Sequence, residues 1–141
     1  MSQDELKQKI REFFETYAFS NLITIDADGI PKGRMMENVP LEDDLVFYFA
    51  TFAQSNKVAE IKANPNASVF LYRPEDHSSI SVLGTAAVVT DDAIRKAKWK
   101  EKWAGFWQEG PTDPSYVLIS VTPGRILYND YPNHASETLE L

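Results

Sequence analysis

The 141-residue sequence contains no cysteine and only two histidines, and these absences exclude several kinds of chemistry. Without cysteine the chain can form no disulfide, no thiolate metal site and no cysteine nucleophile. His77 and His134 lie far apart in expected loops, with no neighbouring ligand at a useful spacing, so we expect no metal site. The sequence also has no G-x-S-x-G motif, no P-loop and no glycine-rich dinucleotide fingerprint.

A long apolar run and an excess of positive charge are also absent. No segment approaches the ~20 apolar residues of a membrane helix, and the first residues are polar and charged, so we expect neither a membrane span nor a signal peptide. The net charge of −7 argues against general nucleic-acid binding. Any phosphate must therefore be held by a local cluster of cations. The length fits one domain, and a cytoplasmic location is the expectation.

The hydrophobic pattern predicts a mainly β protein with helices. A capping box at Ser2 and Glu5 opens an amphipathic helix at about 3–17, and further helices are expected at 56–63 and from Asp91 or Asp92, with apolar residues near helical spacing as far as Phe106. Strands are expected at 21–26, 30–36, 45–50, 67–72, 79–90 and 117–128. Because these strands come in hairpins and consecutive runs, we predict a six-stranded, mostly antiparallel barrel rather than a parallel sheet.

Two local features complete this prediction. Gly84, in the middle of a long strand, indicates a bulge or sharp bend of the kind that curls a sheet into a barrel. The polar tail from Asn129 is expected to be loose.

The segment 45–65 is expected to form a strand, a short turn and a helix. Residues 45–50 are continuously apolar, which is typical of a strand buried on both faces, and Ser55 can cap the helix that follows. A helix start at the end of a buried strand favours an anion, through unpaired N–H groups and the helix dipole. Lys57 in the first turn opposes that dipole, and a counter-anion would remove the conflict. Alternatively, Ser55 is only a cap worth ~1 kcal/mol and Lys57 is a solvated surface residue.

A second cation lies on the expected strand 30–36. Arg34 enters an apolar segment and needs a partner, which could be a carboxylate, solvent or a bound anion. Together with Lys57 and the hydroxyls of Thr51 and Ser55, it could bind one phosphate group. The aromatic residues of the third helix could stack on a flat ring, although such a stripe is usually core or subunit interface. These aromatic residues are Trp99, Trp103, Phe106 and Trp107.

Several short motifs occur in a characteristic order along the chain. They are GRMM at 33–36, FYFAT at 47–51, SNK at 55–57, EI at 60–61, NP at 64–65, SVLGTA at 81–86, FWQEGP at 106–111, DP at 113–114 and VTP at 121–123. In order and spacing they resemble the pyridoxamine 5′-phosphate oxidase-like superfamily of FMN-binding split barrels, and within it the short general-stress-protein-26-like branch. The resemblance runs from about Leu6 to Tyr128.

This resemblance implies a six-stranded antiparallel split barrel that forms a homodimer, with FMN in a cleft between the subunits. It implies that Arg34 and Lys57 bind the phosphate and that Ser55 and Asn56 assist them.

The resemblance also implies which residues lie along the rest of the cofactor. Thr51 and the segment at Met35 and Met36 would lie along the ribityl chain and the isoalloxazine ring. Trp103 or Trp107 of the partner subunit would flank the ring.

The chain departs from the oxidase proper, which carries a longer C-terminal part with an arginine- and histidine-containing substrate motif. That motif is missing around His134, so we do not expect pyridoxamine phosphate oxidation. A flavin-dependent oxidoreductase is the first hypothesis. The alternatives are a non-catalytic dimeric module that stores or senses flavin, or a deazaflavin or haem-type ligand in the same cleft, and FAD in place of FMN also stays open.

Charge reversal tests this assignment. We expect Arg34→Glu and Lys57→Glu each to abolish flavin retention, because each places a carboxylate where a phosphate is expected. The absorbance of the purified variants measures their flavin content. Normal flavin content in both variants would refute the site.

Overall fold

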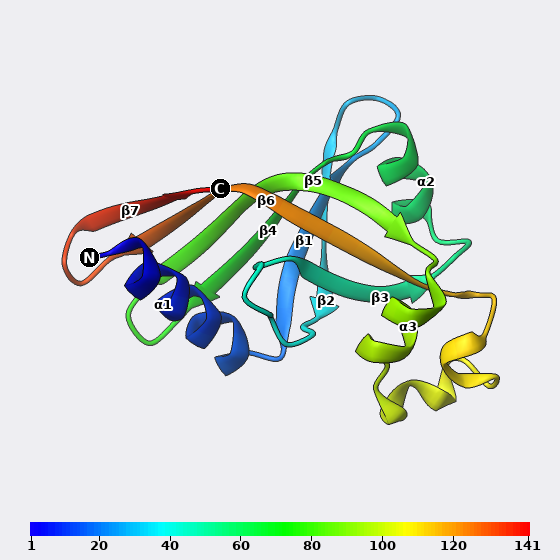
Figure 1. The fold of residues 1–141 in the computed structure, drawn as a ribbon. Coiled ribbons are helices and arrows are strands. Elements are labelled where there is room, and N and C mark those ends of the chain that lie inside the picture. The colour runs from blue at the N-terminus through cyan, green and yellow to red at the C-terminus, as the bar shows by residue number, and fades with distance from the viewer.

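The computed structural model describes residues 1–141 and contains one seven-stranded, mainly antiparallel sheet with three α-helices (Figure 1). The helices are α1 (Gln3–Thr16), α2 (Asn56–Ala63) and α3 (Asp92–Lys98), with short 3-10 helices η1 (Glu101–Gly105) and η2 (Gly110–Thr112). The strands are β1 (Phe19–Ile25), β2 (Pro31–Glu37), β3 (Phe47–Phe52), β4 (Asn66–Arg73), β5 (Ser78–Val89), β6 (Tyr116–Asp130) and β7 (Ala135–Glu140). The predicted class is confirmed, with one strand more than expected.

The sheet follows the order β2-β1-β4-β5-β6-β3, and every pair in it is antiparallel. The long strand β6 also pairs with β7 beyond this path. Since β2 and β3 are the two ends of the path, they do not pair with each other, and the barrel is split between them. None of the helices has the length and apolar character needed to cross a membrane.

The predicted irregularity at Gly84 is confirmed. The register between β5 and β6 shifts between Leu83 and Gly84. A side chain is not tolerated there without movement, because a Cβ on Gly84 would lie 2.5 Å from the carbonyl oxygen of Thr122. The close approach of the two backbones therefore requires glycine at this bend.

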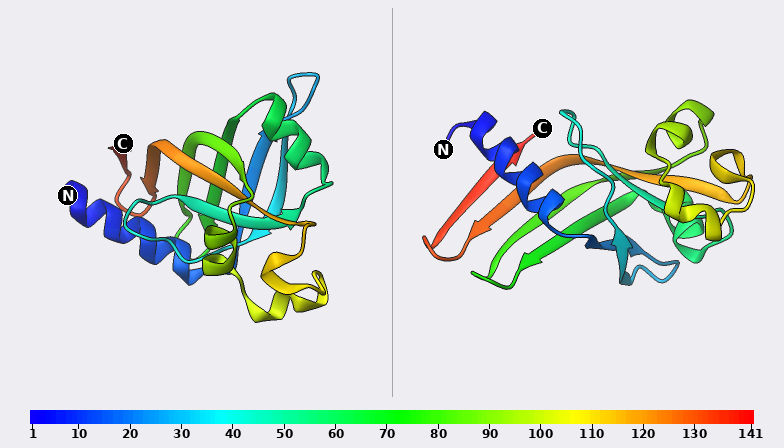
Figure 2. Two further views of the ribbon diagram at one scale, coloured as in Figure 1. Left: turned by 45° about the vertical axis from the view of Figure 1, so that its right-hand side comes forward. Right: turned by 90° about the horizontal axis from the view of Figure 1, so that it is seen from below.

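Helix α1 covers the main core at the end of the sheet where β6 and β7 lie (Figure 2). Leu6, Ile10, Phe13 and Phe14 recur at helical spacing and are buried. The prediction of an amphipathic helix that starts after Ser2 is confirmed, since the Ser2 hydroxyl accepts a hydrogen bond from the Glu5 N–H.

A second core lies under α3, η1 and η2 at the other end of the sheet. The helical pattern predicted as far as Phe106 is wrong, because α3 ends at Lys98 and Trp99 is extended. The break lets the rings of Trp99 and Trp107 both approach Tyr116, each with centroids 5.1 Å apart. Tertiary packing of large rings around a buried tyrosine thus overrides local helical spacing.

Strand β3 connects the two cores and differs from its prediction. It begins at Phe47, because Leu45 has a φ of 58° in the left-handed region. Its burial alternates: Phe47 and Phe49 face the main core, while Tyr48 and Ala50 are half-buried against the second core. A continuous apolar run therefore reflects two different cores rather than complete burial on both faces.

The tail predicted to be loose instead forms β7, which pairs with β6 from Arg125 to Asp130. Leu139 is its anchor, with 1% of its surface exposed in the main core. The open edge of β6 supplies the backbone partners, and the polar sequence of the tail gives no local sign of this pairing.

The anchoring role of Leu139 can be measured directly. We expect Leu139→Ala to lower the free energy of unfolding by about 2–4 kcal/mol, since it leaves a cavity in the main core. Urea denaturation measures the change. Thr138→Ala on the exposed side of β7 is the control and should stay within ~0.5 kcal/mol of the original chain. Equal stability of both variants would mean that β7 does not contribute to the core.

Candidate functional site

A pocket of about 290 Å³ lies at the split between β2 and β3. Its walls come from both strand edges, from the first turn of α2 and from the region of η1. The lining residues are Met35, Met36, Glu37, Ala50, Thr51, Phe52, Lys57, Trp103, Phe106 and Trp107. The fold thus brings together most of the residues that the sequence proposed, although Arg34, Ser55 and Asn56 do not line the pocket itself.

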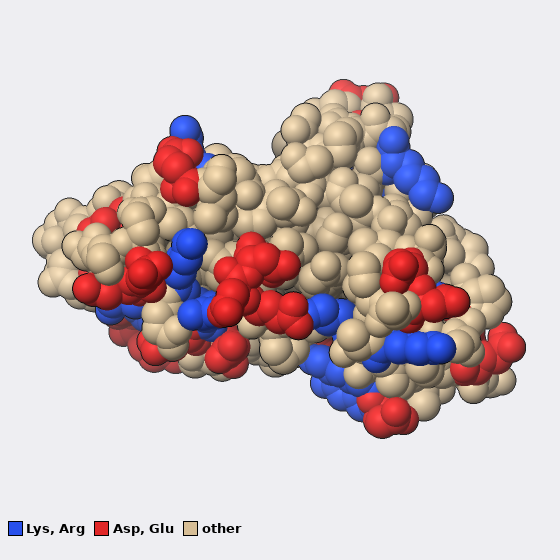
Figure 3. All heavy atoms as spheres, viewed as in Figure 1, with Lys and Arg blue, Asp and Glu red and all other residues tan.

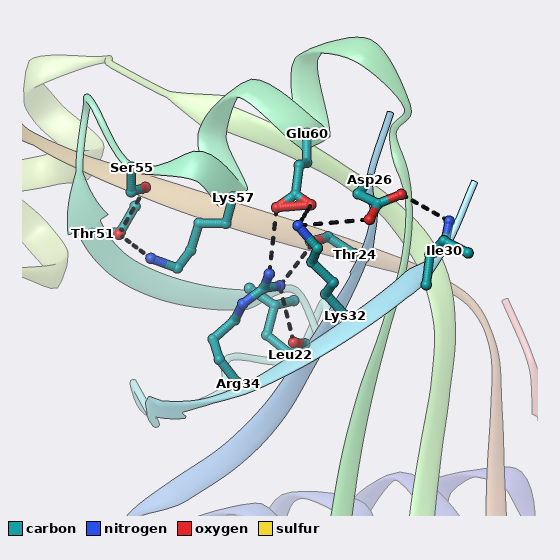
Figure 4. A network of polar contacts seen from close by, with 10 residues as sticks. All are labelled: Leu22, Thr24, Asp26, Ile30, Lys32, Arg34, Thr51, Ser55, Lys57 and Glu60. Carbon is teal, nitrogen blue, oxygen red and sulfur yellow. Dashed lines mark hydrogen bonds and ion pairs between the residues drawn. The ribbon is translucent and has the colours of Figure 1, made fainter. Parts of the chain in front are cut away.

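The polar end of the pocket is formed by Thr51 and Lys57, and Ser55 lies next to it against Thr51 (Figure 4). Lys57 Nζ donates a hydrogen bond to Thr51 Oγ1 at 3.0 Å, and the Thr51 and Ser55 hydroxyls lie 3.3 Å apart. Ser55 occupies the N-cap position of α2, but its side chain makes no capping hydrogen bond, so that part of the prediction is wrong. The hydroxyl faces Thr51 instead, which leaves the first-turn N–H groups of α2 without a side-chain acceptor from Ser55.

Asn56 is the first residue of α2, and its side chain is exposed. It lies next to the polar end of the pocket without lining it.

Arg34 reaches from β2 toward the same place (Figure 4). Its Nη1 donates to Thr24 Oγ1 at 2.7 Å and to the carbonyl oxygen of Leu22 at 3.2 Å. Its Nη2 lies 3.5 Å from Glu60 Oε1, a stretched ion pair. Glu60 is therefore the carboxylate partner that the sequence allowed for Arg34. The shorter hydrogen bonds, which fix the guanidinium, go to the uncharged oxygens of β1.

Lys57 differs from Arg34 because it forms no salt bridge. Thr51 is the hydrogen-bond acceptor of its ammonium. Burial lowers the pKa of Lys57, the nearby Arg34 charge lowers it further, and Glu60 acts in the opposite direction. A half-buried cation beside a second cation is an arrangement that a bound anion would stabilise.

A further carboxylate network lies behind Arg34 and was not predicted. Lys32 Nζ lies 3.6 Å from Asp26 Oδ2 and 3.9 Å from Glu60 Oε2. Asp26 also accepts hydrogen bonds from the Ile30 and Asp28 N–H groups in the β1–β2 turn, and the Ile30 bond chiefly lowers its pKa.

A spacing argument could have found this network. Glu60 follows Lys57 by three residues, which places both on one side of a helix. Lys32 precedes Arg34 by two residues, which places both on one face of a strand.

The other end of the pocket is apolar and largely aromatic. Trp103 and Trp107 are each 4% exposed and belong to the second core, as the alternative reading of the aromatic stripe expected. Trp107 packs against Phe52 with centroids 4.8 Å apart. In contrast, Met35 and Phe106 are 64% and 65% exposed at the rim. Both tryptophans line a pocket formed by their own chain.

Glu37 is the only carboxylate of the pocket wall, and it is already paired. Its Oε2 lies 2.8 Å from Lys100 Nζ and 2.9 Å from Lys102 Nζ. Burial opposes ionisation of Glu37, but hydrogen bonds from the two lysines prevail and lower its pKa. These contacts tie β2 to the segment that carries the aromatic wall, and they leave Lys57 as the unneutralised charge of the pocket.

The surface charge supports the importance of this local cluster. Acidic and basic side chains lie close together along the lower half of the face drawn in Figure 3, and this face has no broad basic patch. With a net charge of −7, general attraction cannot hold an anion, so specific contacts must do so.

Comparisons with known proteins cover the whole chain. Residues 5–138 match the family model described as pyridoxamine 5′-phosphate oxidase like. General stress protein 26 of Bacillus subtilis (strain 168) is 27% identical over 144 residues, which span 100% of both chains. The crystal structure of General Stress Protein 26 from Bacillus anthracis str. Sterne is 33% identical, with a TM-score of 0.81 over 97% of this chain and 99% of that one.

Two further similarities are more distant or partial. A pyridoxine/pyridoxamine 5′-phosphate oxidase of Rhodopseudomonas palustris (strain TIE-1) is 31% identical over 120 residues, so this chain spans only 56% of that relative's length. A pyridoxamine 5′-phosphate oxidase-related, FMN binding protein from Nostoc punctiforme PCC 73102 has a TM-score of 0.69 over 100% of this chain and 97% of that one. At 13% identity, this second likeness shows the fold alone.

The unneutralised charge of Lys57 predicts an unusual effect on stability. We expect ligand-free Lys57→Met to be as stable as the original chain at pH 7, or more stable, because the methionine keeps the apolar stem and removes a half-buried cation. A lysine whose pKa is lower in the folded state destabilises the fold most when it is protonated. The original chain should therefore gain stability relative to Lys57→Met as the pH rises toward 10.5, so that the difference between the two proteins shrinks.

Thermal unfolding of both proteins between neutral and alkaline pH measures this effect. A lower Tm for ligand-free Lys57→Met at pH 7 would contradict it and would show that Lys57 stabilises the fold.

Proposed function

This chain belongs to the pyridoxamine 5′-phosphate oxidase-like family, and from that premise we propose that it is a flavin-binding protein that holds FMN at the split between β2 and β3. One observation carries the proposal. Lys57, a half-buried cation without a carboxylate partner, lies beside Arg34 at the start of α2 and at one end of an apolar pocket. This arrangement suits a ligand with a flat apolar ring at one end and an anion at the other.

The donor set at the polar end fits a phosphate monoester, which carries close to two negative charges at neutral pH. Lys57 and Arg34 would hold the phosphate, because an ammonium and a guanidinium are the side chains that pair best with phosphate oxygens. The Ser55 hydroxyl and the N–H groups at Asn56 and Lys57 would assist. Burial and the nearby Arg34 charge both disfavour the charged form of Lys57, and a bound anion would stabilise that form.

The rest of the pocket fits a flavin ring and its ribityl chain. Thr51 lies between the polar end and the apolar walls, and Met35, Met36 and Trp107 provide surfaces for a flat ring. The β2 and β3 edges that face the split are unpaired with each other, so backbone donors and acceptors remain for the polar edge of a ring.

When bound, FMN supplies the hydride and electron transfer on which an oxidoreductase of this kind depends. The protein contributes binding, orientation and electrostatics. The ionisable residues of the wall are Glu37 and Lys57, of which Glu37 is engaged by two lysines and Lys57 faces the phosphate position. No side chain of the wall is therefore free to act as a general acid or base, which leaves a flavin storage or sensing module as the second candidate.

We further propose that two copies of the chain associate over the outer face of β2, β1 and β4. A hollow of about 490 Å³ on this face is lined by apolar side chains that are unusually exposed for their size. They include Phe19, Met35, Phe70 and Tyr72, with exposures of 54%, 64%, 37% and 46%. Because Met35 lines both this hollow and the pocket, a second copy bound here would lie against the flavin site.

Pyridoxamine phosphate oxidation is not part of the proposal. The chain spans about half the length of the oxidase relative that it matches.

A titration tests the proposed function. We expect purified protein either to show flavin absorbance or to bind added FMN. Riboflavin, which lacks the phosphate, should bind about 10- to 100-fold more weakly, the effect of losing one or two charge-assisted hydrogen bonds. Lys57→Met should weaken FMN binding to a similar degree and leave riboflavin binding unchanged, and Lys62→Met, on the exposed side of the same helix, is the matched control.

The outcomes separate the candidates. A colourless protein that ignores FMN would refute the flavin site, and a deazaflavin or haem-type spectrum would identify a different ligand. Turnover of a reduced nicotinamide cofactor by the FMN-loaded protein would favour the oxidoreductase, whereas bound flavin without turnover would favour storage or sensing.

A further inference from the structure

Glu60 is a largely buried carboxylate that lies next to Arg34 and on the same helix as Lys57 (Figure 4). It lies on α2, one turn after Lys57, and only 10% of its side chain is exposed. Its two nearest cations come from β2: Arg34 Nη2 is 3.5 Å from Oε1, and Lys32 Nζ is 3.9 Å from Oε2. The carboxylate therefore faces the same guanidinium that is proposed to bind phosphate.

These contacts are loose for a buried carboxylate. Oε2 is buried without any hydrogen-bond partner, and the Arg34 contact is at the outer limit of a hydrogen bond. Arg34 instead makes its short bonds to Thr24 and Leu22, so Glu60 is not needed to fix the guanidinium. A buried charge that is incompletely paired is costly, and such a group calls for an explanation.

The charges around Glu60 supply that explanation. Three cationic side chains lie near the space between α2 and β2: Lys32, Arg34 and Lys57. Two carboxylates, Asp26 and Glu60, provide negative charge there. Asp26 is engaged by the N–H groups of the β1–β2 turn. Glu60 is thus the carboxylate that neutralises the empty site between α2 and β2.

We propose that Glu60 is the internal counter-anion of the phosphate site: it offsets the positive charge of Arg34 and Lys57 when no ligand is bound, and it competes with the ligand phosphate for the Arg34 guanidinium. This inference rests on the proposed function, and it means that Glu60 controls how tightly the site binds the ligand phosphate. Glu60 stabilises the empty protein and weakens phosphate binding, since two anions share the same cations. A residue that merely oriented Arg34 would strengthen phosphate binding instead.

The substitution Glu60→Gln separates these roles, because glutamine keeps the size and removes the charge. We expect it to tighten FMN binding by about tenfold or more, the scale of one charge acting through a half-buried site, and to leave riboflavin binding unchanged. The Tm of the ligand-free variant should fall, and inorganic phosphate should raise it more than it raises the Tm of the original chain. Asp28→Asn, an equal change of net charge on the exposed β1–β2 turn, is the control and should change none of these quantities.

Weaker or unchanged FMN binding by Glu60→Gln would overturn the inference. Glu60→Asp keeps the charge but draws it back from Arg34 by one methylene, so it should tighten FMN binding to a smaller degree. It serves the same test if the glutamine variant does not fold, with weaker or unchanged binding again the overturning result.

The inference and the flavin proposal can fail separately. If the original chain binds FMN and Glu60→Gln binds it no more tightly, only the role of Glu60 fails. If neither protein binds FMN but inorganic phosphate stabilises Glu60→Gln more than the original chain, the flavin site fails and the counter-anion role holds. If phosphate stabilises both proteins equally, that role fails as well.

Discussion

Strand β6 sets the geometry on which the rest of the molecule depends. It pairs with β5 along most of its length, with β3 at one end and with β7 at the other. The shift of register at Gly84 bends the β5–β6 pair, and the sheet then curls until its two terminal strands approach without pairing. The split between β2 and β3 is therefore a consequence of strand order and of one close backbone contact, and the pocket lies there because the sheet cannot close.

The two ends of this pocket are held in place by different interactions. The aromatic wall is part of a core, and Trp103 and Trp107 are held by packing around Tyr116. The polar end is held by charges that are not fully paired: Lys57 has a hydroxyl partner, and Glu60 has two distant cations. Binding sites commonly give up stability in this way, because groups that are satisfied within the protein have little to offer a ligand.

The sequence predicted the cation pair correctly as a spatial cluster but not its surroundings. Arg34 and Lys57 could be paired because a strand and a helix start each carry strong local signals, and the family resemblance placed them together. The aromatic segment was predicted less well, since spacing alone could not reveal that the chain would break at Trp99 to pack three tryptophans on Tyr116. Strand β7 was missed because its pairing depends on the free edge of β6, a long-range partner that local composition does not encode.

Taken alone, the sequence determined the class of the protein and the positions of most strands and helices, and it singled out the cations and hydroxyls of the candidate site. These follow from local periodicity, glycine placement and side-chain chemistry, which need no knowledge of distant contacts. Only the tertiary structure decided that Lys57 stays without a carboxylate while Arg34 faces Glu60, and that both tryptophans belong to the core of their own chain. The reason is physical: the partner of a charge and the burial of a ring depend on which elements the folded sheet brings together, and residues 26 positions apart, such as Arg34 and Glu60, carry no local sign of meeting.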